Sequence, residues 1–573
     1  MNGGDLVARV LADRDVPALF TLCGGHISPI LVAAKARGVR VIDTRHEASA
    51  VFAADAAARL TGIPGVAAVT AGPGVTNAMT AIENARLAQS PVVVIGGATA
   101  TALRGRGALQ DIDQLSLIAS RLKWYASAKT VRDLGPLTAR AMDEAAGGVP
   151  GPVFLEIPVD LLYPEDIVRG WYGEKSGGGG RSIAARATRW YLKRHVDKVF
   201  GGDPREVPAA IAPVHDLSKN AVANAAERLG SADRPVLLVG SQATLGTAHA
   251  TASAIERLGV PTYLGGMARG LLGRDSPLQM RHKRRDALKE ADLVVLAGLP
   301  FDFRLDYGRS VPRTTPVISI NRDRADLRRN RRPTLGVQGD PGAFLRSLAE
   351  HARPRERDDW FATLRARDDA READLDERAA SDHEHGVDPL ALLRTVDRVA
   401  ADDAILVADG GDFVATAAYS MRPRGPLGWL DPGPFGTLGV GGGFALGVAA
   451  VRPGRELWIL YGDGSAGYSI AEFDTYVRHG FTPIALVGND ACWAQIAREQ
   501  VEILGDDVGC ALLETDYDRV AAGFGGVGLK IETRAEIEGA LREARRVAAE
   551  DGKPVLVNAV LAKTDFRKGS ISI

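Results

Sequence analysis

Short apolar runs alternate with longer alanine-rich stretches along most of the chain. Typical runs are VAAVTAG (66–72), PVLLVG (235–240) and LWILYGDG (457–464), and each of them ends in a glycine. Apolar runs of this length are typical of strands buried on both faces of a parallel sheet, and the stretches between them are long enough for crossover helices. The pattern predicts βαβ units whose functional loops lie at the carboxyl ends of the strands.

Two segments interrupt this pattern and divide the chain. The first, 166–204, contains four consecutive glycines and then a basic, aromatic stretch, and the second, 351–387, is a charge-dense helical run. We interpret both segments as linkers between domains. A chain of 573 residues is also too long for one hydrophobic core. We therefore expect three doubly wound parallel-sheet domains of the α/β class, at 1–165, 205–350 and 388–573.

The segment YGDGSAGYS (461–469) carries the strongest chemical signal. Gly462 and Gly464 let the backbone turn tightly and approach a phosphate, and Asp463 between them is placed to hold a hard cation. A second buried run, PIALVG, delivers Asn489 and Asp490 about two dozen residues later. Two adjacent parallel strands would then present oxygen ligands at one sheet edge, which suits octahedral Mg²⁺ shared with a diphosphate.

The acidic residue Glu47 is a second candidate. It begins EASAVFAADAAARLTG (47–62), a helix of small residues that indicates close helix–helix approach, as at a subunit interface. Taken alone, Glu47 is equally well interpreted as a catalytic carboxylate or as an exposed acid stabilised by the helix dipole. The glycines of TAGPGVTNAMTAIENA (70–85) and GPFGTLGVGGGFALG (433–447) permit close approach of the backbone to a ligand or to another helix.

Composition and charge argue against several other classes of protein. The formal net charge is −1, so no electrostatic case exists for a nucleic acid or an anionic membrane as partner. The three cysteines are far apart and lack metal-ligand spacing, which fits a reducing, intracellular setting. The N-terminus lacks the pattern of a signal peptide, and no apolar run is long enough to span a bilayer. We therefore expect a cytoplasmic protein.

The Gly-Asp-Gly motif, followed at this distance by Asn489 and Asp490, resembles the fingerprint of thiamine-diphosphate enzymes, G-D-G and then N-N. The family usually has Asn where Asp490 stands, and the carboxylate adds negative charge beside the diphosphate. The resemblance implies thiamine diphosphate and Mg²⁺ as cofactors, with Asp463, Asp490 and the backbone carbonyl of Cys492 as metal ligands. It also implies that the three domains are, in chain order, pyrimidine-binding, middle and diphosphate-binding.

The same resemblance implies roles for individual residues. One N-terminal glutamate, here Glu47, passes a proton to the aminopyrimidine ring of the cofactor, and the loop within 70–85 lies along that ring. A bulky apolar residue, here Leu438, bends the cofactor, and Gly436 supplies a carbonyl to its 4′-amino group. DGGDF (409–413) resembles the diphosphate-side loop. The implied cofactor contacts are Gly72, Pro73, Gly74, Asn77, Gly411, Asp412, Phe413, Gly436, Leu438, Gly462, Asp463, Gly464, Ser465, Asp490, Cys492 and Trp493.

Several stretches resemble a narrower group. TLCGGHISPIL, GGMARGLLGR, WLDPGPFGTLGVG and GNDACWAQIAREQ resemble 2-hydroxyacyl-CoA lyases of the acetolactate synthase-like branch, and the similarity covers nearly the whole chain. This implies cleavage of the C1–C2 bond of a 2-hydroxyacyl-CoA to formyl-CoA and an aldehyde or ketone. Compact bacterial members act on short or branched substrates such as 2-hydroxyisobutyryl-CoA. His26 and Gln110 stand where related aldehyde lyases carry a catalytic histidine and glutamine, although such a histidine is otherwise more often structural.

Other interpretations stay open. A decarboxylating carboligase of the acetolactate synthase type, acting on 2-oxo acids, and a catalytically inactive regulatory homologue are the two alternatives. The resemblance implies an acyl-CoA as substrate, a homodimer as the minimal active unit and commonly a homotetramer.

Related enzymes bind ADP or FAD around the segments of Arg269 and Asn321, but neither segment has a G-x-G-x-x-G turn, so the sequence does not decide whether a nucleotide binds. Arg567 and Lys568 resemble a C-terminal segment that closes over CoA, with a solvated tail as the alternative.

Overall fold

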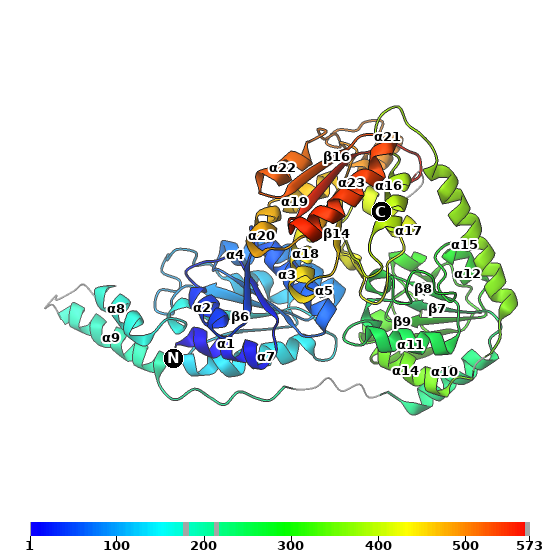
Figure 1. Ribbon diagram of the computed structural model, residues 1–573. Coiled ribbons are helices and arrows are strands. Elements are labelled where there is room, and N and C mark those ends of the chain that lie inside the picture. The colour runs from blue at the N-terminus through cyan, green and yellow to red at the C-terminus, as the bar shows by residue number, and fades with distance from the viewer. Residues whose placement is uncertain (1, 176–182, 211–216, 354, 568–573) are drawn as a thin grey trace. The chain divides into compact units, whose positions relative to one another are not determined.

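The computed structural model describes residues 2–175, 183–210, 217–353 and 355–567. These residues form three parallel sheets with helices packed on their faces (Figure 1). The first sheet belongs to one compact unit, made of residues 1–213 with 446–451, and the other two sheets belong to a second unit. The predicted fold class, three parallel-sheet α/β domains, is confirmed.

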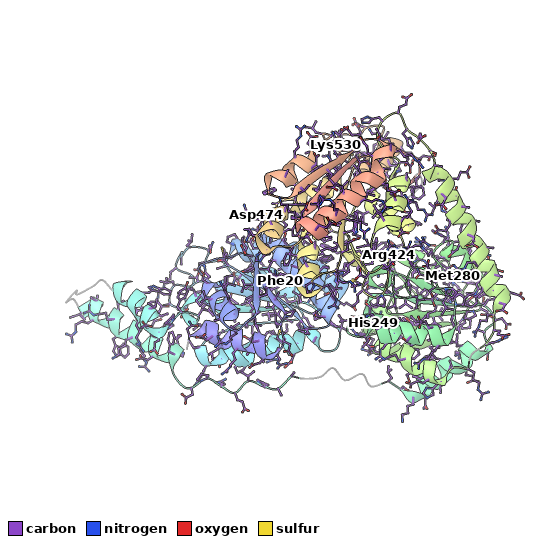
Figure 2. All side chains as sticks on the ribbon, viewed as in Figure 1. Phe20, His249, Met280, Arg424, Asp474 and Lys530 are labelled. Atoms are coloured by element: carbon purple, nitrogen blue, oxygen red, sulfur yellow. The ribbon has the colours of Figure 1, made fainter. Side chains whose placement is uncertain are left out.

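The N-terminal domain contains a six-stranded parallel sheet with the order β2-β1-β3-β4-β6-β5. Its central strands β3 and β4 are buried along their whole length, which explains why their sequences are apolar without alternation. Phe20 of β1, labelled in Figure 2, is fully buried in this domain. The strands are β1 (Ala18–Thr21), β2 (Arg40–Asp43), β3 (Gly65–Val69), β4 (Val92–Ala98), β5 (Trp124–Ser127) and β6 (Val153–Pro158). The helices that belong to this sheet are α1 (Gly3–Asp13), α2 (Ser28–Ala36), α3 (Glu47–Thr61), α4 (Pro73–Asn77), α5 (Met79–Ala88), α6 (Gln114–Ile118) and α7 (Leu134–Ala146).

Helix α3 lies directly against strand β3 because both surfaces carry small residues. A methyl group on Gly65 would come within 1.8 Å of the carbonyl oxygen of Ala54, so only glycine fits there. The helix begins after His46, whose side chain accepts a hydrogen bond from a first-turn N–H, and it ends at Gly62 in the left-handed conformation. Because α3 follows β2, its first residue, Glu47, stands at the carboxyl edge of the sheet.

Two further helices of the first unit, α8 (Glu165–Lys175) and α9 (Ile183–Phe200), lie in the segment predicted as a linker at 166–204. The glycine run of that prediction lies outside the described residues. Val168 and Tyr172 of α8 and Val196 of α9 form a small apolar cluster with Ala100 and Ala102, which follow β4. This cluster attaches both helices to the N-terminal domain.

The middle domain has a five-stranded parallel sheet with the order β11-β10-β9-β7-β8. Separate apolar clusters cover its two faces, one beneath α10, α11 and α14 and the other beneath α12 and α15. The strands are β7 (Pro235–Val239), β8 (Thr262–Leu264), β9 (Leu293–Ala297), β10 (Val317–Asn321) and β11 (Leu335–Gln338). The helices are α10 (Lys219–Ser231), α11 (Ala248–Leu258), α12 (Arg284–Glu290), α13 (Arg324–Leu327), α14 (Pro341–His351) and α15 (Asp358–Ala379).

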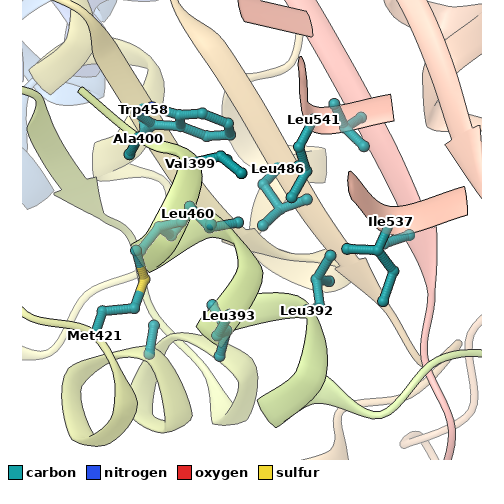
Figure 3. Close-up of a cluster of buried hydrophobic side chains, with 14 of the residues drawn as sticks. Leu392, Leu393, Val399, Ala400, Met421, Trp458, Leu460, Leu486, Ile537 and Leu541 are labelled. Carbon is teal, nitrogen blue, oxygen red and sulfur yellow. The ribbon is translucent and has the colours of Figure 1, made fainter. Parts of the chain in front are cut away.

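The C-terminal domain has a six-stranded parallel sheet with the order β13-β12-β14-β15-β17-β16. Figure 3 shows its core, where Leu392 and Leu393 of α16 and Ile537 of α23 pack near Trp458 of β14 and Leu486 of β15. The strands are β12 (Ile405–Ala408), β13 (Trp429–Leu430), β14 (Leu457–Gly462), β15 (Ile484–Asn489), β16 (Val527–Ile531) and β17 (Val555–Val560). The helices are α16 (Pro389–Val399), α17 (Asp412–Ser420), α18 (Val440–Val451), α19 (Asp463–Ser469), α20 (Glu472–His479), α21 (Ala494–Leu504), α22 (Tyr517–Gly523) and α23 (Ile537–Arg546).

Helix α15 occupies most of the second predicted linker, 351–387, and contacts the domains on either side of it. Its Glu372 accepts hydrogen bonds from Arg281 and His282 of the middle domain, at 2.8 and 2.7 Å, and from Arg394 of α16 at 2.5 Å. This shared carboxylate joins the middle and C-terminal domains through charged hydrogen bonds. Within the described part of the chain, no helix combines the length and the apolar character that crossing a membrane requires.

Candidate active site

A cavity of about 250 Å³ lies at the carboxyl edge of the C-terminal sheet, where β12, β14 and β15 end side by side. These three strands deliver the DGGDF, GDGS and GND segments to the same edge because neighbouring parallel strands end together. Every cofactor contact predicted in this domain lines the cavity. The lining residues are Gly410, Gly411, Asp412, Phe413, Gly436, Leu438, Gly462, Asp463, Gly464, Ser465, Gly488, Asp490, Cys492, Trp493, Ala494, Gln495 and Ile496.

Asp463 joins the two halves of the metal motif. Its carboxylate accepts the backbone N–H of Gly464 at 2.7 Å and that of Cys492 at 3.2 Å, so the turn after β14 is tied to the turn after β15. The side chain is almost fully buried. Burial raises the pKa of Asp463, and the backbone N–H groups oppose that shift.

Asp490, the departure from the family motif, lies close to this carboxylate. Burial, together with the nearby charges of Asp463 and Asp412, raises the pKa of Asp490 to about 7. Two carboxylates of the same charge therefore meet in a partly buried space. A divalent cation between them would remove that repulsion, and carboxylate oxygens are the ligands that Mg²⁺ prefers.

Glycines shape the cavity in two ways. A methyl group on Gly464 would come within 2.4 Å of the Trp493 ring, so the indole packs directly on the backbone of the turn. Leu438 similarly lies against Gly410, where a methyl group would be 2.4 Å from its Cδ2 atom. By contrast, methyl groups on Gly411 and Gly436 would meet no protein atom within 4 Å. These two glycines face open space that a ligand can fill.

Arginines stand near the first residue of α17. Arg498 of α21 binds the Asp412 carboxylate at 2.5 Å, and Arg567 near the C-terminus lies 3.6 Å from its other oxygen. The Arg567 guanidinium also lies over the ring of Tyr419, with 5.4 Å to the ring centroid. The tail is thus held at α17 as far as Arg567, whereas Lys568 lies outside the described residues.

The N-terminal domain holds the other predicted residues at the carboxyl edge of its own sheet. Glu47 is 5% exposed, and its carboxylate accepts a hydrogen bond from the Asn77 side chain at 3.0 Å. A methyl group on Gly74 would lie 3.6 Å from the same carboxylate, which brings the loop after β3 against it. Gly74 and Asn77 of the predicted loop therefore lie beside Glu47, with Gly72 and Pro73 just before them in the chain, and the alternative of an exposed helix-start acid is excluded.

His26 and Gln110 lie near the same loop. Thr70, just after β3, places its hydroxyl 3.3 Å from Nδ1 of His26. Burial lowers the pKa of His26, which favours the neutral ring at pH 7. Gln110 has a left-handed backbone, and its carbonyl oxygen would be 3.0 Å from a methyl group on Gly72. The structure therefore places both residues at the glycine loop, and their catalytic roles stay predictions.

Sequence reasoning missed Gln114, which stands four residues beyond Gln110. Its amide oxygen accepts the Gly72 N–H at 3.2 Å, and its amide nitrogen donates to Glu156 at 3.0 Å. Gln114 is only 2% exposed, so it holds the glycine loop in position from the protein interior. The sequence carried only a weak signal for this residue. Both glutamines of RGALQDIDQ fit the position where related aldehyde lyases carry a glutamine, and only the fold shows which of the two is buried.

The residues suggested for a nucleotide in the middle domain have protein partners. Arg269 donates a hydrogen bond to the carbonyl oxygen of Ala418 at 2.8 Å, and its guanidinium lies over the Trp429 ring. Asn321 accepts a hydrogen bond from Gln242 at 2.9 Å. Arg269 therefore helps to join the middle and C-terminal domains, and nucleotide binding stays an open prediction.

Three family models match the chain in the order of its domains. Residues 1–117 match the N-terminal domain of thiamine pyrophosphate enzymes, residues 222–348 their central domain and residues 409–559 their C-terminal domain. The chain belongs to the thiamine pyrophosphate enzyme family. Thiamine pyrophosphate, or thiamine diphosphate, is thus the cofactor that the N- and C-terminal domains of this family bind, and the predicted family is confirmed.

Relatives of this thiamine pyrophosphate enzyme extend over its full length. The chain is 51% identical to 2-hydroxyacyl-CoA lyase 2 of Danio rerio, over all of this chain and 93% of the relative. It is 48% identical to 2-hydroxyacyl-CoA lyase 2 of Homo sapiens, over all of this chain and 92% of that protein. Acetolactate synthase large subunit IlvG of Mycobacterium tuberculosis is more distant, at 34% identity over 98% of this chain and 96% of the synthase.

Proposed function

We propose that this thiamine pyrophosphate enzyme is a lyase that cleaves the C1–C2 bond of a 2-hydroxyacyl-CoA to give formyl-CoA and an aldehyde or ketone. One observation carries the proposal: proteins named 2-hydroxyacyl-CoA lyase 2 align with the whole chain at about half identity. The geometry supports the proposal, because the ionisable residues predicted for the two halves of the site lie at the carboxyl edges of their sheets. Short or branched substrates such as 2-hydroxyisobutyryl-CoA are the first to test.

The cavity of the C-terminal domain would hold the diphosphate end of the cofactor with Mg²⁺. Asp463 and Asp490 would supply carboxylate oxygens, and Cys492 would supply its backbone carbonyl. Among the described residues no group of three or more His, Cys, Asp and Glu side chains forms a metal site. A cation held here therefore needs ligands from the backbone and the diphosphate as well, which is the usual way that proteins bind Mg²⁺.

Bound thiamine diphosphate supplies a nucleophilic carbon and an electron sink for bond cleavage next to a carbonyl. Glu47 would hold a proton at the pyrimidine ring, and Asn77 orients its carboxylate. His26 would accept the proton of the substrate 2-hydroxyl group, a role that a neutral imidazole can fill. Gln110 would bind the substrate beside it.

We further propose that two copies of the chain form each site. The residues for the pyrimidine end and those for the diphosphate end lie in different domains, and each group stands at the carboxyl edge of its own sheet. A homodimer is then the smallest active unit, and we expect a homotetramer in the cytoplasm. Whether the middle domain also takes ADP or FAD can be tested on the same purified protein.

An acetolactate synthase-type carboligase is the second candidate, favoured by the 34% identity to the mycobacterial synthase. The deciding experiment supplies purified protein, thiamine diphosphate and Mg²⁺ with either 2-hydroxyisobutyryl-CoA or pyruvate. We expect formyl-CoA and acetone from the first substrate, measured by mass spectrometry, and loss of that activity when EDTA removes the metal. Brisk CO₂ release from pyruvate, with no cleavage of any 2-hydroxyacyl-CoA, would replace the lyase with the second candidate.

A further inference from the structure

We propose that Asp409 is a positioning residue for the cofactor, holding together two loops that form the diphosphate end of the site. Its carboxylate follows strand β12 and is 1% exposed. One carboxylate oxygen accepts the N–H of Gly439 at 2.8 Å, and the other accepts the N–H of Gly441 at 2.6 Å. Asp409 itself is absent from the residues that line the cavity, so it acts through its neighbours.

Both loops that Asp409 connects contribute residues to the cavity. Gly410, Gly411 and Asp412 follow it directly along the chain, and Leu438 immediately precedes Gly439. Leu438 also lies on the backbone of Gly410, with no room for a methyl group between them. The two short hydrogen bonds therefore fix the spacing between the diphosphate-side loop and the apolar residue expected to bend the cofactor.

Ser465 of the GDGS turn lies near the same carboxylate. Burial raises the pKa of Asp409 to about 7, while the N–H groups of Gly441 and Gly439 and the Ser465 hydroxyl oppose that shift. Ser465 lines the cavity, and it also donates a hydrogen bond to the carbonyl oxygen of Gly462 at 3.0 Å. The buried carboxylate thus joins the segment after β12 to the start of α18, with the GDGS turn beside them.

The space around Asp409 is closed. A methyl group on Gly441 would come within 2.5 Å of the Tyr461 ring and 2.9 Å of the Asp409 carboxylate. The next N–H of α18, that of Gly442, is bound by the Ser469 hydroxyl at 3.1 Å. These N–H groups already donate hydrogen bonds to protein acceptors, so they are not available to bind a phosphate directly. The start of α18 therefore positions the loop that precedes it.

The test uses Asp409→Asn in the full chain and measures the Kd for thiamine diphosphate with Mg²⁺ by quenching of tryptophan fluorescence. An amide has the same shape but only one acceptor atom, so one of the two loop contacts is lost. We expect the Kd to rise at least tenfold, while the thermal midpoint of the cofactor-free protein changes by no more than a few degrees. The matched control is Asp402→Asn, whose side chain is 99% exposed and lies 3.8 Å from the Arg274 guanidinium.

Ser469→Ala separates positioning from simple helix capping, because it removes a neighbouring cap on α18 and leaves Asp409 intact. We expect it to raise the Kd less than threefold. An Asp409→Asn protein whose Kd is within twofold of the wild type overturns the proposal, as does an equal rise in Kd for Ser469→Ala. If the Asn variant does not fold, Asp409→Glu is measured in its place, and unchanged cofactor binding in that variant overturns the proposal too. Because no substrate is needed, the result is independent of the lyase reaction proposed above.

Discussion

At the scale of single residues, the surroundings of Glu47 distinguish it from an ordinary acid at the start of a helix. It begins a helix, where an acid is common, yet it is buried and bound by Asn77. We predict that Glu47→Gln lowers the turnover of 2-hydroxyacyl-CoA by about 10²–10⁴-fold, because an amide cannot exchange a proton with the pyrimidine ring. Cofactor affinity should stay within a few-fold of the wild type. Formyl-CoA formation measures the turnover, a cofactor titration measures the affinity, and deuterium exchange at the thiazolium C2 position measures the activation of the cofactor.

The control for this variant is Glu165→Gln, which changes an exposed acid at the start of α8. It should leave turnover and exchange unchanged. If Glu47→Gln exchanges the C2 proton at the wild-type rate, then Glu47 does not take part in activating the cofactor, even if turnover falls for another reason.

The two metal-motif carboxylates should differ in importance. Asp463 also receives two backbone N–H groups, whereas Asp490 stands where the family usually has Asn. We predict that Asp490→Asn keeps activity within about tenfold, because an amide oxygen can bind Mg²⁺ and the repulsion with Asp463 disappears. Asp463→Asn should lose more than about 100-fold, because its amide nitrogen would face the Cys492 N–H. Activity titrated against Mg²⁺ measures both variants, and equal losses would contradict this ranking.

Sequence motifs located most of the residues that line the site, and they missed residues that act behind it. Gly462, Asp463 and Asp490 were predictable because their spacing follows from two strands ending at one sheet edge. Gln114 and Asp409 were not, because each is defined by hydrogen bonds to residues distant in the sequence, such as Gly72 for Gln114 and Gly439 for Asp409. A glutamine at the start of a short helix, or an aspartate just after a strand, carries no local sign that it will be buried.

At the scale of elements, the turn from β14 into α19 depends on one glycine. We predict that Gly464→Ala raises the Kd for the cofactor at least tenfold and destabilises the protein by about 1–3 kcal/mol, because the new methyl group overlaps the Trp493 ring. Trp493→Ala in the same chain should recover part of the lost stability by making room. Urea unfolding and cofactor titration of the single and double variants measure this coupling.

Gly467→Ala is the matched control, because it lies in the same helix and a methyl group there meets nothing within 4 Å. It should leave cofactor binding unchanged. Additive effects of Gly464→Ala and Trp493→Ala, with no recovery, would show that contact between these two residues does not set the shape of the turn.

Strands were easier to predict than the elements between domains. The apolar runs ending in glycine gave strands such as β7 and β14, because a strand buried on both faces has little choice of residue. Helices α8 and α9 lie where a linker was expected. Their packing residues, such as Val168 and Val196, are few and are separated by charged residues. The apolar face of each helix was therefore not visible in the composition of the segment.

At the scale of the whole molecule, Glu372 connects two domains, and its effect should depend on pH. Burial raises the pKa of its carboxyl group, but hydrogen bonds from His282 and Arg394 and the charge of Arg281 outweigh burial and lower it to about 2. Since the folded-state pKa lies below the ordinary value of 4.5, the ionised group stabilises the fold above about pH 4.5. That contribution is lost as the pH falls from about 4.5 toward 2.

We predict that Glu372→Gln lowers the free energy of unfolding at pH 7 by about 1–3 kcal/mol, because two arginines lose their shared carboxylate. The difference from wild type should shrink once the pH falls below 4.5, since the wild-type carboxylate is then protonated in the unfolded chain while it is still ionised in the folded protein. Urea unfolding at pH 7 and pH 3.5 measures this change, with Glu377→Gln on the exposed side of the same helix as the control. An equal difference at both pH values would mean that the shape of the side chain, and not its charge, holds the middle and C-terminal domains together.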